Sequence, residues 1–449
     1  MENVKRRLYS KLVEWKNESS RKPLILEGAR QVGKTYLLRD FGQREYERLA
    51  YFNFEEDPKL ASLFQGNLEP RHLIDQLSIY QSLKDDSKIT PQSLIFFDEI
   101  QECPEALNSL KYFQESAPEY HVIAAGSLLG VKLKTLRSFP VGKVHFLQLH
   151  PLSFLEFLNA MDKTPLKDLL EAPLSLSPLP SIFHEELNQL LKTYLFVGGM
   201  PEAVQSYVHT REGSAVRKIQ NDILRSFSLD FAKHAPPTDI MKISRIWSSI
   251  PSQLAREKKK FTLSLLHKNA RGREYEGALQ WLTDAGLIQK VYRISLPHLP
   301  LEGYREESVF KIYLLDTGLL GALCDLSYRT VVEGNEILTH FKGSLTENYV
   351  AQELKATHEK TLYYWESRGE AEVDFLLAWD EDVWPLEVKS GSSKKLRSLT
   401  EYSKKYHPPC LSLTSPDPFS KNNPLCHYPL YGISLFPGWA RVGREKAST

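Results

Sequence analysis

The eight residues GARQVGKT, from Gly28 to Thr35, satisfy the pattern G-x-x-x-x-G-K-[ST]. An apolar run, residues 24–26, precedes them, and an amphipathic helical pattern, residues 36–41, follows them. Two glycines let the backbone curl so that successive N–H groups point inward at one anion. The positive end of the following helix adds to the attraction. The stretch therefore predicts a phosphate-binding loop between a strand and a helix.

The loop also predicts which residues bind a nucleotide. The side chain of Lys34 is expected to reach the β- and γ-phosphates, and the hydroxyl of Thr35 is expected to bind Mg²⁺. We therefore expect ATP and Mg²⁺ as cofactors. The predicted nucleotide-binding residues are Gly28, Ala29, Arg30, Gln31, Val32, Gly33, Lys34, Thr35 and Tyr36.

Two acids follow a second apolar run, SLIFFDEIQ, residues 93–101. Ligands bind at the carboxyl ends of the strands in a parallel sheet of this kind. Asp98 would hold Mg²⁺, and Glu99 would orient and polarise the attacking water. Ser127 ends a third apolar run, where its hydroxyl can contact the γ-phosphate or that water. Lys34, Glu99 and Ser127 are the predicted catalytic residues, and the predicted activity is ATP hydrolysis.

The order of apolar runs predicts an α/β fold. Candidate strands at residues 24–26, 49–54, 94–97, 121–125 and 143–149 are separated by helical or loop segments. Short buried strands that alternate with helices indicate a parallel sheet with helices on both faces. Further along the chain we expect mostly helices, then three helices and a strand that suggest a winged helix, and finally a mixed α/β domain. The predicted segments are 1–165, 166–235, 236–298 and 299–449.

The last segment carries a second group of acids. Residues 371–390 form two apolar runs around a polar turn, which predicts a β-hairpin. Asp374 lies in its first strand, Glu387 and Lys389 lie in its second, and Glu347 lies on a helical stretch before it. This order resembles the PD-(D/E)xK phosphodiesterase motif. The three carboxylates would hold Mg²⁺, and Lys389 would orient water or offset developing charge.

A structural interpretation of the same residues is open. Lys389 can neutralise Glu387 or Asp374 in a salt bridge, which leaves a fold that only docks a partner. Contact with DNA is open in the same way. Lys268, Arg271 and Arg273 lie on or near the third helix of the winged-helix segment, and Lys258, Lys259 and Lys260 come just before it. Those side chains can follow a phosphate backbone, or they can be a solvated helix face.

The chain resembles the AAA-type P-loop ATPases of bacteria and archaea that carry an uncharacterised C-terminal region joined to a nuclease-like fold. The motifs behind this resemblance are GARQVGKT, FFDEIQECPEAL, AAGSLLGVKL, FPVGKVHFLQLHPLSFLEFL, YLFVGGMPEAV, FKGSLTENYVAQEL and AEVDFLLAWDEDVWPLEVKSG. The resemblance implies the strand order 5-1-4-3-2, with Ser127 as the sensor-1 residue. An oligomer in which a neighbouring subunit lends an arginine is left open by the sequence. Arg137 is a candidate for that arginine, and a solvated basic loop is an equally good interpretation of it.

Composition limits the remaining possibilities. The chain has 449 residues, a net charge of +1 and 42% hydrophobic residues, so it can bury sizeable cores but carries no global field toward DNA. Four scattered cysteines and no long apolar run favour a cytoplasmic protein without a membrane partner. Two functions remain open: an ATPase with a second, DNA-cleaving activity, and a nucleotide-dependent switch or scaffold whose C-terminal domain binds DNA or protein without cleaving it.

Overall fold

The computed structural model describes residues 6–85, 88–132, 142–172, 178–334, 339–367, 369, 371–391 and 396–438. The chain forms two compact units. Among the described residues, the first unit comprises residues 6–150 with Asp284–Gly286, and the second unit comprises Pro151–Thr283 and residues 287–438. The boundary lies at residue 150, before the predicted 165, because Phe154 and Phe157 pack their rings against Tyr194 of the second unit.

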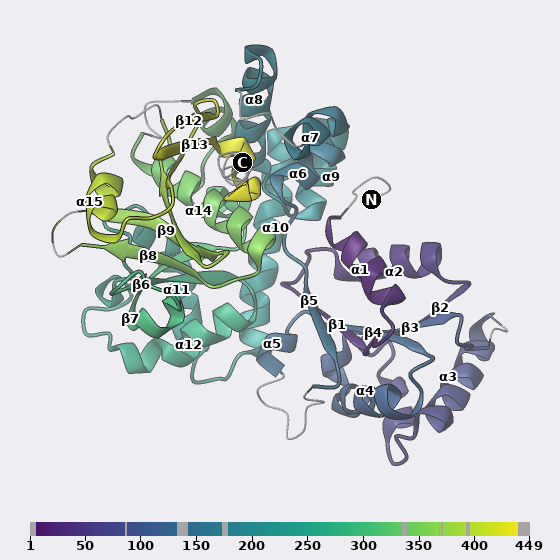
Figure 1. The fold of residues 1–449 in the computed structure, drawn as a ribbon. Coiled ribbons are helices and arrows are strands. Elements are labelled where there is room, and N and C mark those ends of the chain that lie inside the picture. The colour runs from purple at the N-terminus through teal and green to yellow at the C-terminus, as the bar shows by residue number, and fades with distance from the viewer. Residues whose placement is uncertain are drawn as a thin grey trace. The chain divides into compact units, whose positions relative to one another are not determined.

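The first unit is a parallel sheet between two layers of helices (Figure 1). Its strands, in the order β2-β3-β4-β1-β5, confirm the order that the resemblance implies. Helices α1 and α2 lie on one face of the sheet, and α3 and α4 lie on the other. The strands are β1 Leu24–Glu27, β2 Arg48–Asn53, β3 Ser93–Asp98, β4 His121–Ala125 and β5 His145–Gln148. The helices are α1 Leu8–Asn17, α2 Lys34–Glu45, α3 Pro70–Asp85, α4 Pro104–Ser116 and α5 Leu129–Lys132, with 3₁₀ turns at Pro58–Phe64 and Ile100–Glu102.

Strand β3 lies in the core of the first unit. All six residues of β3 are buried, so the strand is apolar on both faces up to Asp98. Ile95 and Phe97 point to the layer of α3 and α4, where Leu107 and Leu110 belong to the same apolar cluster. Burial on both faces is what a strand in the middle of an α/β sheet requires. The polar end of β3 therefore marks the edge where the core stops.

The second unit joins a helical part to an eight-stranded mixed sheet of order β12-β13-β11-β10-β9-β8-β6-β7. Helix α14 packs against β7 and β10, and α15 packs against β9 (Figure 1). The helices are α6 Phe154–Ala160, α7 Thr164–Glu171, α8 Ser181–Val197, α9 Pro201–Thr210, α10 Gly213–His234, α11 Ile240–Leu254, α12 Gly272–Asp284, α13 Thr317–Leu323, α14 Thr339–His358 and α15 Arg397–Tyr406. The strands are β6 Ile288–Ile294, β7 Arg305–Leu314, β8 Leu362–Glu366, β9 Glu372–Trp379, β10 Asp382–Val388, β11 Leu411–Ser415, β12 Ser420–Asn422 and β13 Leu425–Pro429.

The segment expected to be a winged helix is organised differently from the prediction. Of the three expected helices, the structure has α11 and α12 with only a short 3₁₀ turn, Leu263–Leu265, between them. The strand that follows, β6, pairs with β7 and also runs parallel to β8, so it belongs to the large sheet. The predicted boundary at 298 therefore divides one sheet. A local pattern cannot reveal this pairing, because the partner strand lies about 70 residues further along the chain.

A buried aspartate holds the helical part of the second unit to its sheet. Asp316 caps α13 by accepting a hydrogen bond from the Leu319 N–H at 2.9 Å, and its other oxygen accepts one from the Gly199 N–H at 2.6 Å. The neighbouring glycine is required, because a Cβ atom at Gly198 would lie 2.2 Å from Asp316. These hydrogen bonds connect the turn VGGMP, residues 197–201, to the segment LLDTG, residues 314–318, within an apolar surrounding.

Candidate nucleotide site and a buried acidic cluster

The predicted phosphate loop lies between β1 and α2, and its two glycines adopt conformations that other residues rarely take. Gly28 has φ = 150° and Gly33 has φ = 92°. A Cβ atom at Gly28 would lie 2.3 Å from the carbonyl oxygen of Leu149, the residue that follows β5. Glycine is therefore needed at position 28 for close approach and at position 33 for the turn into the helix. This local geometry suits a loop that curls around a phosphate.

Lys34 begins α2 and turns its side chain back into the loop. Its side chain is buried, and its ammonium donates hydrogen bonds to the carbonyl oxygens of Gly28 and Ala29, each at 2.8 Å. Burial lowers the pKa of Lys34 to about 8, against the raising effect of Glu99 and Asp98. The positive charge therefore lies at the centre of the loop and is bound only to neutral carbonyl groups by these two hydrogen bonds.

Thr35 and Asp98, the two predicted Mg²⁺ ligands of the first unit, lie in direct contact at the end of β3. The Thr35 hydroxyl donates to Asp98 Oδ2 at 2.7 Å, and Tyr51 donates to the same oxygen at 3.0 Å. Burial raises the pKa of Asp98, whereas the hydrogen bond from Thr35 lowers it. These groups offer only oxygen ligands, which are the ligands that Mg²⁺ prefers. The pair therefore fits the cation that accompanies a nucleotide.

Glu99 lies one residue beyond β3 in a left-handed conformation with φ = 48°. Ser127 Oγ donates to its carboxylate at 2.9 Å from one oxygen and 3.2 Å from the other. The side-chain amide of Gln101 also donates to Glu99. The structure thus brings the predicted catalytic pair Glu99 and Ser127 into direct contact. Gln101 was missed in the sequence, although its place two residues after Glu99 was a signal that it stays near the carboxylate.

A second residue that the sequence prediction missed, Arg6, lies outside the phosphate loop and hydrogen-bonds to its backbone. Its guanidinium is buried and donates to the carbonyl oxygens of Val32 and His150. Within the loop, Ala29 and Val32 are buried, and the Arg30 guanidinium lies 3.4 Å from Ser127 Oγ. Nothing in the spacing of the N-terminal residues indicates a role for Arg6. Arg137, the candidate arginine finger, lies outside the described residues.

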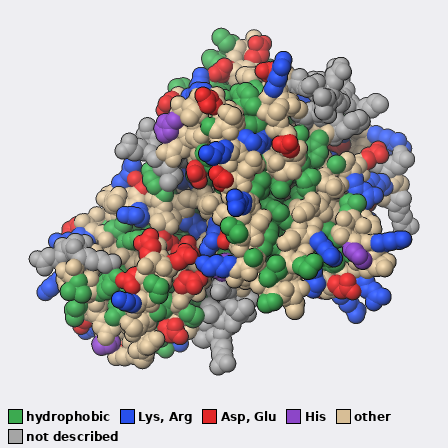
Figure 2. All heavy atoms as spheres, turned by 180° about the vertical axis from the view of Figure 1, so that it is seen from behind, with side chains coloured by type: hydrophobic (Ala, Val, Ile, Leu, Met, Phe, Trp, Pro, Cys, Tyr) green, Lys and Arg blue, Asp and Glu red, His purple; other side chains and the backbone are tan. Residues whose placement is uncertain are grey.

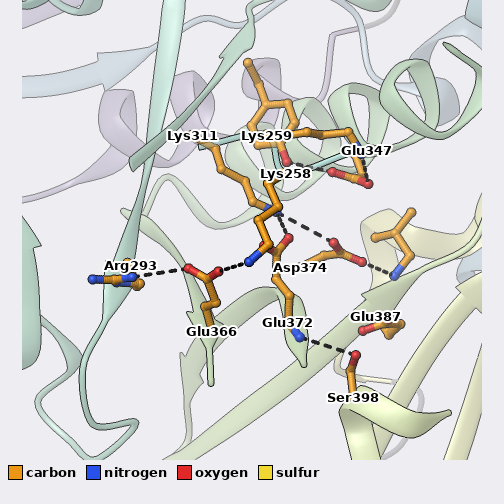
Figure 3. Close-up of polar contacts among 12 residues, drawn as sticks. Lys258, Lys259, Arg293, Lys311, Glu347, Glu366, Glu372, Asp374, Glu387 and Ser398 are labelled. Atoms are coloured by element: carbon orange, nitrogen blue, oxygen red, sulfur yellow. Dashed lines mark hydrogen bonds and ion pairs between the residues drawn. The ribbon is translucent and has the colours of Figure 1, made fainter. Parts of the chain in front are cut away.

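The acids of the second unit also converge, and we call Glu347, Glu372, Asp374 and Glu387 the acidic cluster (Figure 3). The predicted hairpin forms from β9 and β10, and its two-residue turn, Asp380 and Glu381, has positive φ at both positions. Two such residues give a turn whose twist matches that of the strands. Helix α14 supplies Glu347, and Glu387 lies in β10. Glu347, Asp374 and Glu387 are each less than a tenth exposed.

Lysine ammonium groups lie within ion-pair distance of all four members of this cluster. The Lys259 ammonium lies 2.5 Å from Glu347 Oε1, and the Lys389 ammonium lies 2.6 Å from Glu387 Oε1. Lys311 binds Glu372, and its ammonium is also 3.7 Å from Asp374 Oδ1. The other oxygens of two carboxylates have partners as well. Glu347 Oε2 accepts from the Tyr313 hydroxyl at 3.0 Å, and Asp374 Oδ2 accepts from the Val388 N–H at 2.8 Å.

The pKa values in the cluster reflect burial and this pairing. Burial raises the pKa of Asp374 well above its usual value, and the nearby charges of Glu347 and Glu387 add to the rise. Burial also acts to raise the pKa of Glu347, but the ammonium groups of Lys259 and Lys311 outweigh it and leave that pKa lowered. Among Glu347, Asp374 and Glu387, Glu347 is therefore the residue whose negative charge is best compensated.

The donor set of the acidic cluster does not fit a resident Mg²⁺ ion. Within the described parts of the chain, no three or more Asp, Glu, His or Cys side chains are placed to hold a metal ion. One buried carboxylate oxygen, Glu387 Oε2, has no hydrogen-bond partner. The sequence prediction missed Lys311 and Glu372, and it considered Lys259 only as a basic residue that could contact DNA. A lone lysine inside the apolar run VFKIYLL was a signal, because a lysine buried in a strand requires an acidic partner.

Comparison with protein families finds three matches along the chain. Residues 20–158 match the AAA domain family. Residues 188–330 and 342–428 match two domains of unknown function, DUF8612 and DUF4143. The first match contains the phosphate loop, Asp98, Glu99 and Ser127. An AAA-type P-loop ATPase fold in the first unit is therefore supported, and no match assigns a nuclease to the second unit.

Two mycobacterial proteins, both described as uncharacterized, show similarity to part of the chain. One is from Mycobacterium tuberculosis and the other from Mycobacterium bovis, and each is 30% identical over 119 residues. The match covers 26% of this chain and 25% of each relative.

Solved structures that are similar include a Walker-type ATPase of Pyrococcus abyssi, with 16% identity and a TM-score of 0.43, which covers 72% of this chain and 96% of that one. The Orc1 protein of Aeropyrum pernix in complex with DNA has 14% identity and a TM-score of 0.30, over 71% and 90%. AMPPCP-bound DnaA of Aquifex aeolicus has 14% identity and a TM-score of 0.29, over 62% and 86%. In the described residues, no helix is long and apolar enough to cross a membrane.

Proposed function

We propose that the first unit binds and hydrolyses ATP. The observation that carries this proposal is the meeting of Thr35, Asp98 and Glu99 beside a glycine-bent loop that encloses the ammonium of Lys34. In this proposal Lys34 exchanges its bonds to loop carbonyls for bonds to phosphate oxygens. Thr35 and Asp98 would hold Mg²⁺, which would supply charge stabilisation to the phosphates.

Glu99 is proposed to orient and polarise the attacking water. The hydrogen bonds that Ser127 and Gln101 donate to its carboxylate would fix the orientation of that group toward the water. Ser127 is proposed to contact the γ-phosphate or the water as well, so one hydroxyl links the acid to the nucleotide. An arginine from a neighbouring subunit would add charge stabilisation, and an oligomer follows from the proposal only if that arginine is required.

The test compares nucleotide binding with turnover. We expect Lys34→Ala to lose ATP binding in calorimetry, and Glu99→Gln to keep binding but release phosphate at least about a hundredfold more slowly. The matched control is Glu102→Gln, which changes an exposed acid in the same segment and should leave both quantities unchanged. Hydrolysis by Glu99→Gln at the wild-type rate would remove Glu99 from its role. Failure of the folded wild-type chain to bind any nucleoside triphosphate would overturn the whole proposal.

We propose that the second unit binds DNA without cleaving it, and that its affinity for DNA depends on whether the first unit has bound a nucleotide. The lysine pairing of the acidic cluster favours this role over metal-dependent cleavage. Lys268, Arg271 and Arg273 are exposed on or just before α12 and would follow a phosphate backbone. Figure 2 shows basic side chains dispersed among acidic ones over the face seen there, so DNA affinity should depend on a local group.

Cleavage and docking are separated by one experiment with plasmid and oligonucleotide DNA. With Mg²⁺ or Mn²⁺ present, we expect no cleavage by the wild type, but DNA binding that changes when ATP is added. Neutralising Arg271 and Arg273 should weaken that binding and reduce its dependence on salt concentration. Metal-dependent cleavage that Asp374→Ala abolishes would establish instead that the second unit is a phosphodiesterase.

A further inference from the structure

We propose that Lys311 takes the place of a divalent cation in the acidic cluster, so that the second unit completes this site with its own ammonium group. The inference deepens the docking role proposed for the second unit. It does not depend on ATP hydrolysis by the first unit.

The first support is the position of Lys311. It lies in β7 with 0% of its surface exposed, and its ammonium bonds Glu372 and lies 3.7 Å from Asp374 Oδ1 (Figure 3). The ring of Tyr364 faces the same ammonium, with its centroid 4.9 Å away. A buried ammonium is stable only where acceptors or aromatic faces replace its water. Lys311 is therefore built into the cluster from β7, although β6 and β8 separate β7 from β9 in the order of the sheet.

The second support is that the other carboxylates have cations of their own. Lys259 binds Glu347 and Lys389 binds Glu387, so three ammonium groups meet the four carboxylates of the cluster. An entering divalent cation would have to displace Lys311 from between Glu372 and Asp374. The displaced ammonium would then need new partners inside the apolar core, which is a large cost in a medium of low dielectric constant.

The third support is that Asp374 has little coordination capacity left. Its Oδ2 accepts the Val388 N–H at 2.8 Å, a bond that ties β9 to the end of β10, and its Oδ1 faces Lys311. Of the acidic cluster, only Glu387 Oε2 is both buried and without a hydrogen-bond partner. Mg²⁺ and Mn²⁺ are held by several oxygen ligands, so an entering ion would have to compete with the Val388 N–H and with Lys311 for the oxygens of Asp374.

The experiment is a Mn²⁺ titration of the full chain, without nucleotide, in an Asp98→Asn background that removes the carboxylate of the first unit. Free Mn²⁺ is followed by its electron paramagnetic resonance signal. We expect no Mn²⁺ to bind Asp98→Asn at concentrations up to about 1 mM. Adding Lys311→Met should create a site, and adding Asp374→Asn to that double variant should remove it again. Circular dichroism checks that each variant is folded.

Stability gives a second readout, because Lys311→Met leaves buried carboxylates without their cation. Mn²⁺ at about 100 times its Kd should raise the Tm of the Lys311→Met variant by roughly 5 °C and leave that of the parent unchanged. The inference is overturned if Asp98→Asn alone binds Mn²⁺ and loses it with Asp374→Asn. It is equally overturned if folded Lys311→Met gains no Mn²⁺ binding. If Lys311→Met does not fold, the inference is tested by comparing the Mn²⁺ binding of Asp98→Asn with that of the double variant Asp98→Asn, Asp374→Asn. Failure of ATP hydrolysis would leave these outcomes untouched.

Discussion

The affinity of the first unit for ATP should fall sharply above pH 8, because the lysine of the phosphate loop loses its charge there. Lys34 is buried among carbonyl groups, and burial lowers its pKa to about 8 from the usual 10.5. Below pH 8 the ammonium is charged and attracts the triphosphate. Above pH 8 most molecules carry a neutral amine, which gives a polyanion no charge to bind. The phosphate groups themselves are already ionised in this range, since their last pKa is near 6.

The size of the effect follows from this value. With a pKa of about 8, roughly nine-tenths of the Lys34 side chains are charged at pH 7 and roughly one-tenth at pH 9. If only the charged form binds, the apparent Kd rises about tenfold between these two pH values, or about 1.4 kcal/mol. An exposed lysine with a pKa near 10.4 would stay almost fully charged over the same interval.

Fluorescent ATP analogues titrated between pH 6.5 and pH 9.5 measure this step. The matched control is Lys88→Ala, which removes an exposed lysine from the same unit and should keep the full pH dependence. Any residual ATP binding by Lys34→Met should have an apparent Kd that does not change between pH 7 and pH 9. A wild-type Kd that is flat from pH 7 to pH 9, with the fold intact by circular dichroism, would refute the argument. It would mean that the ammonium of Lys34 is stabilised far better than its contacts in the loop indicate.

Three further variants test individual contacts. Ser127→Ala removes the hydroxyl that holds Glu99, and kcat for ATP should fall roughly ten- to a hundredfold in a phosphate-release assay while Kd changes little. Gly28→Ala places a Cβ atom 2.3 Å from the Leu149 carbonyl oxygen, so calorimetry should detect at least about tenfold weaker ATP binding. Both carboxylate oxygens of Asp316 accept a backbone hydrogen bond, and Asp316→Asn replaces one of these oxygens with an NH₂ group, which cannot accept. Chemical denaturation should show that this variant destabilises the second unit by about 2–4 kcal/mol.

The first unit could be predicted closely because its signals are local. Five apolar runs predicted five strands, and β4 has the predicted bounds, His121–Ala125. The loop glycines, the buried strand and its acidic end are all consecutive in the chain, so one pass along the sequence finds them. Their meeting in space follows from the rule that parallel strands place their carboxyl ends at one edge. Arg6 could not be found in this way, because its partners Val32 and His150 are distant in sequence.

The second unit resisted prediction because its decisive contacts are long-range. The hairpin of β9 and β10 and the helix that carries Glu347 were predicted from local patterns, and the structure confirms both. The pairing of β6 with β8 and the approach of Lys311 to Asp374 were not predicted. Each joins segments about 60 to 70 residues apart, and neither leaves a periodic signal. An apolar strand that contains one lysine indicates only that an acidic residue lies near the lysine, and not which residue this is.

The two buried lysines show how the same side chain can prepare a site or complete one. Lys34 hydrogen-bonds neutral carbonyl oxygens, so an anion that enters the loop gains a charged partner and the lysine regains the charge stabilisation that burial removed. Lys311 bonds Glu372 beside Asp374, so its charge is already compensated inside the protein. Electrostatic attraction for a new ligand depends on charge that the protein has not itself neutralised. By this reasoning the lysine of the first unit is poised to bind, whereas the lysine of the second unit holds its strands together.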